Sequence, residues 1–338
     1  MSLIKVLGID LGKSTFHVIG HDHSGREQLK RKFNRKQLLQ FLSNHSPVLI
    51  AMESCGGSHW LARKIEAFGH QVKLIPPQYV KPYVKTNKND FIDADAIAEA
   101  VTRPSMRFVS IKPEQAQVVS VIQRIRSSYV KERTACMSRM GAILLEFGMS
   151  FPKGHSQMKK LFQWLTDKGE PIPTALMHEL VEHHEYYTQL NELIQKQDKK
   201  LAAITANDER TQRLKSIPGI GDLTASRCLS DISNAHDFKS GRHMAAWLGL
   251  VPHQYSTGGK STLLGISKRG NRALRTLFIH GARALMSRPE SASKAFGNWL
   301  ISLRARKPYN VAVVALANKL ARIAWSVMVT KQPFEIRV

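Results

Sequence analysis

Acidic residues that end apolar, strand-like segments constrain this chain more than any other feature of its sequence. The segment IKVLGIDL is typical of a β-strand that ends near Asp10, and PVLIAMES is typical of a second strand that ends at Glu53. A buried, unpaired carboxylate is costly, and a bound metal ion is the usual compensation. Neighbouring strands that both end in a carboxylate can bring these groups close together. The pattern therefore predicts an α/β fold with a metal-binding edge.

A third acidic element follows in the segment NKNDFIDADAIAEAV, which has a helical composition. Asp90 and Asp93 are three positions apart and share one face of this helix, whereas Asp95 falls off that face. Clustered carboxylates can hold two ions about 3.5–4 Å apart around an attacked phosphate, as two-metal nucleases do. Ordinary surface acids are the alternative interpretation. The four expected Mg²⁺ ligands are Asp10, Glu53, Asp90 and Asp93, whose positions resemble those of the metal ligands in ribonuclease-H-like nucleases.

The charge of the chain indicates what such ions would act on. The formal net charge is +24 over 338 residues, and a strongly basic protein gathers phosphates. From residue 251 onward, fifteen Lys or Arg residues stand against only two acids, Glu290 and Glu335. Phosphate binding by such a segment would release counterions and depend strongly on salt. We therefore expect a nucleic-acid partner that contacts mainly the C-terminal part.

The composition is that of a soluble globular protein, with 43% apolar residues. The longest apolar stretch, NVAVVALANKLARIAWSVMV, is interrupted by Lys319 and Arg322, and the N-terminal segment lacks a secretory cleavage pattern. These features predict a cytoplasmic protein. Cys55, Cys136 and Cys228 form no CxxC pair, which argues against a zinc ribbon or a disulfide framework and predicts buried thiols.

Three regions follow from the order of the expected elements. Residues 1–105 alternate strand-like and helical segments, which is an α/β pattern. Residues 106–206 begin with a proline-containing break and continue as two long amphipathic segments, which predicts an antiparallel helical pair or coiled coil. This pair could be a strut for dimerisation or part of a simple bundle. Residues 207–338 are expected to form a mainly helical C-terminal domain.

The C-terminal region opens with RLKSIPGIGDLTASRCL, in which two helical segments flank Pro-Gly-Ile-Gly. This pattern is typical of a helix-hairpin-helix motif, whose glycines let main-chain N–H groups approach a phosphate at the next helix N-terminus. A glycine-rich turn between packed helices is the alternative. The expected phosphate-binding residues of the whole region are Gly219, Gly221, Lys260, Lys268, Arg269, Arg272 and Arg275.

The segment HQYSTGGK places hydroxyl groups beside a flexible, cationic turn. Ser256 precedes Gly258 and Gly259, and nearby cations such as Lys260 could stabilise both an incipient alkoxide and the charge on an attacked phosphate. A hydroxyl that contacts phosphate without reacting is the simpler interpretation of these residues alone.

In this order, GIDLGKS, the AMES segment, NKNDFIDADAIAEA, SIPGIGDLTA, WLGLVPHQYSTGGK and GISKRGNRALRTLFIHGARAL resemble the insertion-sequence transposases of the one-ten and eleven-eleven group. The resemblance covers essentially the whole chain and extends to pilin-gene DNA invertases. It implies a RuvC-like N-terminal domain, a coiled-coil region and a C-terminal transposase domain. By this resemblance, the catalytic Asp-Glu-Asp-Asp tetrad of the family corresponds to Asp10, Glu53, Asp90 and Asp93. Its nucleophilic serine corresponds to Ser256. Thr257 would take the serine position without a one-residue gap after Tyr255.

The resemblance further implies a site-specific DNA recombinase of an insertion sequence. Ser256 would attack a DNA phosphate to give a phosphoserine linkage, Mg²⁺ on the tetrad would position the scissile group, and strand exchange would pass through a Holliday junction. The expected partners are element and target DNA, a structured bridge RNA and further copies of the chain, from dimer to tetramer. Two alternatives remain, a RuvC-like junction endonuclease that uses metal-activated water and a non-catalytic nucleic-acid-binding protein.

Overall fold

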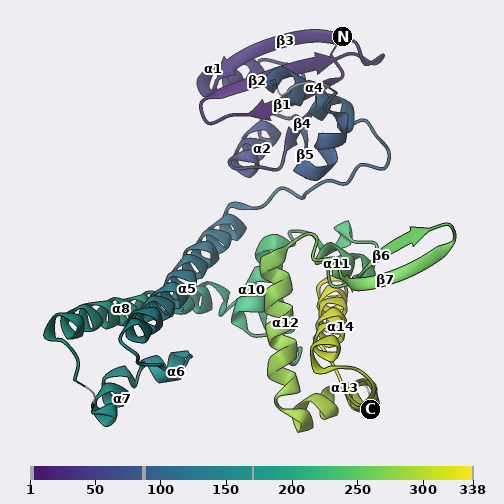
Figure 1. Ribbon diagram of the computed structural model, residues 1–338. Helices are drawn as coiled ribbons and strands as arrows, with labels where there is room; N and C mark the ends of the chain where they lie inside the picture. Colours follow the sequence, from purple (N-terminus) through teal and green to yellow (C-terminus); the bar gives the residue numbers. More distant parts are fainter. Residues whose placement is uncertain (1–3, 86–88, 170, 337–338) are drawn as a thin grey trace. The chain divides into compact units, whose positions relative to one another are not determined.

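The computed structural model describes residues 4–85, 89–169 and 171–336. Its internal contacts divide the chain into two compact units, Met1–Glu114 and Gln115–Val338 (Figure 1). Asn87 and Lys88, which open the third acidic segment, lie outside the described residues.

The first unit is built on a five-stranded mixed sheet with the strand order β3-β2-β1-β4-β5 (Figure 1). β1 pairs antiparallel with β2, and β2 with β3, whereas β1, β4 and β5 run parallel to one another. The strands are β1 (Val6–Leu11), β2 (Thr15–His21), β3 (Glu27–Asn34), β4 (Leu49–Glu53) and β5 (Gln71–Ile75). The strands expected to end near Asp10 and at Glu53 are confirmed, and the mixed sheet is consistent with the expected α/β domain.

Helices cover both faces of this sheet, because alternate residues of its central strands are apolar on each side. Leu7 and Ile9 point to one face and pack there with α1 and α2. Val6 and Ala51 point to the other face and pack with α3 and α4. The helical elements are α1 (Arg35–Ser43), α2 (Ser58–Glu66), α3 (Pro77–Val80), the 3-10 turn η1 (Lys81–Tyr83) and α4 (Asp90–Ala100).

The long helical pair expected from the sequence is present as α5 (Glu114–Glu146) and α8 (Thr174–Thr205). Arg126 is paired with Asp198, and the Cys136 thiol donates to the carbonyl oxygen of His183 at 3.4 Å. Since residue numbers rise along one helix as they fall along the other, the two helices are antiparallel. They are joined through α6 (His155–Met158) and α7 (Leu161–Lys168).

The remainder of the second unit is mainly helical, as expected, with one β-hairpin. Its helices are α9 (Glu209–Lys215), α10 (Asp222–Asp231), the 3-10 turn η2 (Ala235–Asp237), α11 (Gly241–Trp247), α12 (Arg272–Met286), α13 (Pro289–Arg306) and α14 (Tyr309–Thr330). The hairpin consists of β6 (Pro252–Thr257) and β7 (Lys260–Ile266). Gly258-Gly259 between β-favouring residues is the two-residue turn signal that sequence analysis treated only as a flexible turn.

The apolar stretch noted in the sequence forms α14, a core helix of this unit. Among the described residues, only α14 has the length and composition that could cross a membrane. Leu316, Ala317 and Leu320 are fully buried against the neighbouring helices, and this packing accounts for the apolar composition of the helix. Cys136 and Cys228 are buried as expected, whereas the expectation was wrong for Cys55, which lies exposed in the turn after β4.

Candidate active site and nucleic-acid surface

Asp10 and Glu53 lie side by side on neighbouring parallel strands. The register aligns Gly8 with Ala51 and Ile9 with Met52, so that Asp10 and Glu53 are the next residues along β1 and β4. Residues two apart on a strand point to the same face, and Ala51 belongs to the core beneath α4. The sheet therefore presents both carboxylates toward the side on which α4 packs.

The close approach of α4 to β1 brings the second pair of carboxylates to the same place. A Cβ atom on Gly8 would lie 2.2 Å from the carbonyl oxygen of Ala94, so only glycine leaves room for the helix there. Asn89 caps α4, because its side-chain oxygen accepts from the N–H of Phe91 at 3.0 Å. Asp90 and Asp93 consequently stand in the first turn of α4, next to Asp10.

The electrostatics link Asp10 with both acids of α4, and Glu53 with Asp10 and Asp93. The pKa of Asp10 is raised by burial first and by the negative charges of Asp93 and Asp90 next, while His17 acts in the opposite direction. Burial, followed by the charges of Asp10 and Asp93, also raises the pKa of Glu53. Among the described residues, none of the four forms an ion pair with Lys or Arg. Oxygen ligands that repel one another and have no Lys or Arg partner among the described residues suit a divalent cation.

His17 is a residue of this cluster that sequence analysis missed. It lies directly opposite Asp10 in the antiparallel register of β1 and β2, so both side chains point to the same face. Its Nδ1 atom is 3.5 Å from Oδ2 of Asp90. One potential ligand atom from each of Asp10, His17 and Asp90 lies within 4.8 Å of the other two. In the sequence, the short turn at Gly12-Lys13-Ser14 predicts a hairpin. Counting residue pairs back from this turn would have placed His17 opposite Asp10.

The hairpin of the second unit separates the two candidate nucleophiles. Because Ser256 pairs with Ser261 and Thr257 pairs with Lys260, the two hydroxyls point to opposite faces of the ribbon. Gln254 Nε2 donates to Ser256 Oγ at 2.8 Å. Both strands are largely exposed. Lys260 lies on the face of Thr257, so the structure does not support the expectation that it stabilises an alkoxide on Ser256.

The basic segment after β7 has a fixed backbone and exposed side chains. A Cβ atom on Gly270 would lie 1.8 Å from the carbonyl oxygen of Trp247, which shows how tightly this loop packs on the end of α11. Asn271 caps α12 by accepting from the N–H of Leu274 at 3.0 Å. The loop leaves the side chains of Lys268, Arg269 and Arg272 exposed, as their expected role in phosphate binding requires.

Arg275 requires a correction. It was expected to bind phosphate, but its side chain is buried and its Nη1 atom donates to the carbonyl oxygens of Leu248 at 2.8 Å and Arg269 at 2.9 Å. Arg275 therefore ties the basic loop to the end of α11. It follows the buried Leu274 and lies one turn before the buried Phe278, so it falls on the inner face of α12, which a charge count along the sequence does not reveal.

The Pro-Gly-Ile-Gly turn lies between α9 and α10, as the hairpin motif requires. Gly221 precedes α10 and has open space where a Cβ atom would be. Gly219 has a positive φ of 84°, and a Cβ atom there would lie 2.9 Å from the carbonyl oxygen of Gly281 in α12. Packing against α12 thus explains Gly219, whereas Gly221 stays available for the proposed phosphate contact.

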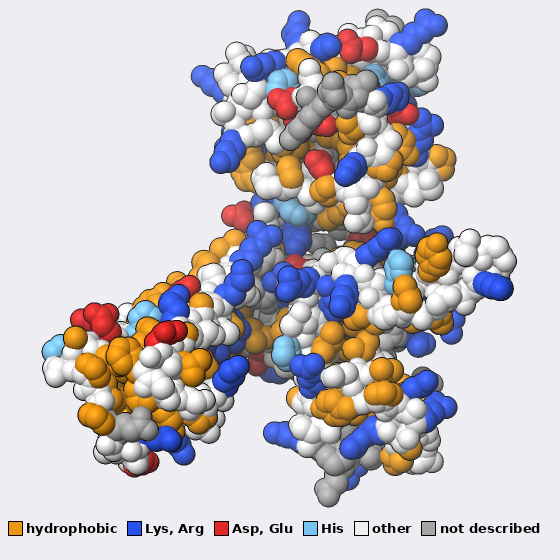
Figure 2. All heavy atoms as spheres, viewed as in Figure 1, with side chains coloured by type: hydrophobic (Ala, Val, Ile, Leu, Met, Phe, Trp, Pro, Cys, Tyr) orange, Lys and Arg blue, Asp and Glu red, His pale blue; other side chains and the backbone are white. Residues whose placement is uncertain are grey.

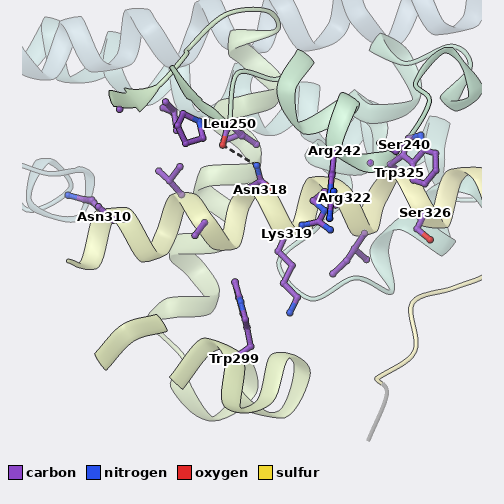
Figure 3. Close-up of a pocket in the computed structure, with 18 of the residues that line it drawn as sticks. Ser240, Arg242, Leu250, Trp299, Asn310, Asn318, Lys319, Arg322, Trp325 and Ser326 are labelled. Atoms are coloured by element: carbon purple, nitrogen blue, oxygen red, sulfur yellow. Dashed lines mark hydrogen bonds between the residues drawn. The ribbon is translucent and has the colours of Figure 1, made fainter. Parts of the chain in front are cut away.

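A cavity of about 1210 Å³ lies between α11, α13, α14 and the base of the hairpin. Its walls are mostly apolar, and Arg242, Lys319 and Arg322 add positive charge, with no carboxylate among its described lining residues (Figure 3). Lys319 Nζ lies 4.0 Å from the centroid of the Trp299 ring. Burial, followed by the charge of Arg322, lowers the pKa of Lys319.

On the visible face of the C-terminal helices and hairpin, Lys and Arg side chains outnumber Asp and Glu (Figure 2).

Clustered carboxylates without Lys or Arg partners among the described residues, together with a strongly basic helical unit, are typical of divalent-metal-dependent enzymes that act on nucleic acid. Residues 211–298 match the family model described as "Transposase IS116/IS110/IS902 family", and residues 7–149 match a second model described as "Transposase". The chain belongs to the IS110/IS116/IS902 family and is a DNA transposase. The family resemblance seen in the sequence is thereby confirmed.

Individual relatives support this assignment along the whole chain. The chain is 46% identical to the transposase for insertion sequence element IS1328 of Yersinia enterocolitica, over 97% of each protein. It is 38% identical to the transposase for insertion sequence element IS1111A of Coxiella burnetii, over 99% of this chain and 92% of that relative. The pilin gene-inverting protein of Moraxella bovis is 22% identical over 98% of each protein.

Proposed function

We propose that this transposase is a site-specific recombinase in which a metal-binding carboxylate cluster and a serine nucleophile act on the same DNA phosphate. The observation that carries the proposal is the convergence of Asp10, Glu53, Asp90 and Asp93 from two strands and one helix, without Lys or Arg partners among the described residues. A purely structural role would not call for a cluster of carboxylates in which Asp10 and Glu53 are each raised in pKa by neighbouring acids.

The cluster fits Mg²⁺, because hard divalent ions prefer carboxylate oxygens. When bound there, Mg²⁺ would polarise the phosphate and offset the charge that develops on it. The four side chains would orient the scissile group through this ion. We assign this RuvC-like role to residues 1–105, a coiled-coil role to residues 106–206 and the transposase domain to residues 207–338.

Ser256 is the proposed nucleophile. Its Oγ atom would form a bond to phosphorus while the bond from phosphorus to one DNA oxygen breaks, and the serine proton would be lost as that oxygen leaves as a hydroxyl. The hydrogen bond from Gln254 holds Oγ on one face of the ribbon, and Gly258 and Gly259 give the phosphate access at the turn. Reversal of this step on a second strand would rejoin the DNA and allow exchange through a Holliday junction.

The basic surface of the second unit supports nucleic acid as the bound partner. We propose that Gly221, Lys260, Lys268, Arg269 and Arg272 contact phosphates and position the duplex without reading its sequence. By family resemblance, sequence choice belongs to a bridge RNA that pairs with donor and target DNA.

A homo-oligomer is supported by an apolar stripe on the helical pair. Val118, Val121 and Ile125 are exposed on α5 at spacings of three and four residues, so they lie on one face of that helix. An apolar stripe that remains in water can mark an interface. We propose that α5 contributes to a dimer, from which a tetramer is built, and that the protein works in the bacterial cytoplasm with nucleoid DNA.

Incubation of the purified protein with its element-end DNA and any RNA that co-purifies tests this function. We expect strand cleavage that requires a divalent ion, stops in chelator and leaves protein covalently attached to DNA. Metal-dependent cleavage without any covalent adduct would favour a junction endonuclease that uses water. Binding without cleavage in the complete mixture would favour a non-catalytic protein. Sequencing of the co-purified nucleic acid tests the bridge RNA, since only element-encoded RNA agrees with the proposal.

A further inference from the structure

We propose that Nδ1 of His17 is a direct metal ligand, together with Asp10 and Asp90, and that this nitrogen makes one ion position prefer Mn²⁺ to Mg²⁺. The inference rests on the proposed function of the carboxylate cluster and adds a ligand that the Asp-Glu-Asp-Asp tetrad does not contain. The cluster would then contain two ion-binding positions. One has the His17 nitrogen and carboxylate oxygens as ligands, and the other has carboxylate oxygens alone.

The geometry places the three side chains around one point. Asp10 and His17 face each other across β1 and β2, and α4 brings Asp90 to the same side of the sheet. Their nearest ligand atoms fall within 4.8 Å of one another. Two ligands of one ion with bonds of about 2.1 Å are separated by at most about 4.2 Å. Adjacent ligands of such an ion lie about 3.0 Å apart, so side-chain rotations that bring the three atoms closer together by about 1–2 Å would let all three bind one cation.

The surroundings of His17 hold its ring in place. Its side chain is only 12% exposed, and the ring packs edge-on against Phe91 with a centroid separation of 4.6 Å and an interplanar angle of 75°. Phe91 directly follows Asp90 in α4, so the same turn fixes both the carboxylate and the imidazole. A preorganised ring loses little conformational freedom when it binds a metal ion.

The chemistry of the imidazole gives the selectivity. Carboxylate oxygens alone suit Mg²⁺, Ca²⁺ and Mn²⁺ alike. An imidazole nitrogen favours transition-metal ions, and Mn²⁺ is the one of these three that belongs to that group. Magnesium binds in a nearly ideal octahedral shell of oxygens and dehydrates reluctantly. A position that offers Nδ1 of His17 with Asp10 and Asp90 should therefore retain Mn²⁺ more strongly than Mg²⁺.

The same strand provides a matched control. His21 lies four residues further along β2, and its Nε2 atom is 2.8 Å from Oδ1 of Asp95 in α4. Among the described residues, no second carboxylate joins His21 and Asp95 in a potential metal cluster. Replacement of His21 changes a histidine–aspartate contact between the same two elements without touching the proposed ligands.

Electron spin-echo envelope modulation of Mn²⁺ bound to the full-length protein tests the assignment without reference to activity. We expect nitrogen coupling in the wild type and in His21→Gln, and its loss in His17→Gln. Titration should show Mn²⁺ affinity reduced by about 10-fold or more in His17→Gln, with Mg²⁺ affinity changed much less. Circular dichroism establishes that each variant is folded, and the wild-type spectrum is informative without any substitution.

Other results would contradict either the role of His17 or the carboxylate site itself. Mn²⁺ that binds in an Asp10-dependent way without nitrogen coupling would overturn the role of His17 and leave the carboxylate site intact. Nitrogen coupling that survives in His17→Gln, or equal losses of Mn²⁺ and Mg²⁺ affinity, would also overturn it. Mn²⁺ binding that is unaffected by Asp10→Asn would instead contradict the carboxylate site itself, and with it the proposed function.

Discussion

Gly8 of β1 lies directly beneath Ala94 of α4, where a Cβ atom on the glycine would be 2.2 Å from the alanine carbonyl oxygen. The nitrogen of Ala98, one turn further along α4, would be 2.7 Å from the same atom. The absence of a side chain at this single position lets the helix rest on the strand. The distance between Asp10 and the acids of α4 therefore depends on a residue that carries no functional group.

Gly8→Val should displace α4 and separate the carboxylates. We expect the free energy of unfolding to fall by about 1–3 kcal/mol or more, because overpacking against a main-chain oxygen cannot be relieved by rotating a side chain. Divalent-ion affinity should fall as well. Chemical denaturation and metal titration measure the two effects. Gly141→Ala in α5, where a Cβ atom meets nothing within 4 Å, is the control and should stabilise by about 0.5–1 kcal/mol. Wild-type stability in Gly8→Val would contradict the packing argument.

Asp10→Ala and Asp93→Ala should each reduce strand cleavage by about 100-fold or more while leaving nucleic-acid binding largely intact. Loss of a ligand displaces the ion, and the basic surface lies on other residues. A cleavage assay and a binding assay on the same DNA separate the two properties. Asp95→Asn, which alters another acid of α4, serves as the control and should cleave normally. Wild-type cleavage by either alanine variant would remove that residue from the site.

In the metal-free protein, the contribution of the carboxylate cluster to the free energy of unfolding should fall as the pH rises. Burial and neighbouring negative charge raise the pKa of Asp10 and of Glu53 above their ordinary values. The folded state therefore binds these protons more tightly than the unfolded state does. The resulting stabilisation is fully present below the ordinary pKa of the carboxyls and is lost as the pH rises through their raised pKa in the folded state. We expect Asp10→Asn to be more stable relative to wild type at about pH 7 than at about pH 4 in chelator. Thermal unfolding at several pH values measures this, and Mg²⁺ should remove the advantage.

Arg272→Gln and Arg275→Gln should have different effects although both residues lie on α12. Arg272 is exposed, so its replacement should weaken binding to related and unrelated DNA alike and flatten the slope of log affinity against log salt by about one unit. Arg275 donates to two carbonyl oxygens, so its replacement should lower the free energy of unfolding by about 1–3 kcal/mol. Salt titrations and denaturation curves distinguish the two. A changed choice of target site in Arg272→Gln would instead indicate base reading.

Ser256→Ala should eliminate the covalent protein–DNA adduct, whereas Thr257→Ala should only reduce it. The two hydroxyls point to opposite faces of the hairpin, so one phosphate cannot meet both in the same orientation. Denaturing gels of a suicide DNA substrate measure the adduct, which should also vanish in chelator. An adduct that persists in Ser256→Ala and disappears in Thr257→Ala would identify Thr257 as the nucleophile.

Much of the framework follows from short-range sequence patterns. The apolar segments before Asp10 and Glu53, the acidic helix and the long amphipathic pair were each predicted and are present. Such patterns are informative because strand and helix periodicities depend on neighbouring residues. The hairpin around Gly258 was missed as a structure, since its turn was interpreted only as flexible.

The sequence by itself determined the elements, the acidic residues at their ends and the excess of positive charge toward the C-terminus. Only the tertiary structure decided which groups meet and which remain accessible. It placed His17 opposite Asp10, fixed α4 on Gly8 and directed Arg275 inward, where it holds main-chain carbonyls. The physical reason is that strand register, helix packing and burial depend on contacts between residues distant in the chain, which composition and local spacing do not specify.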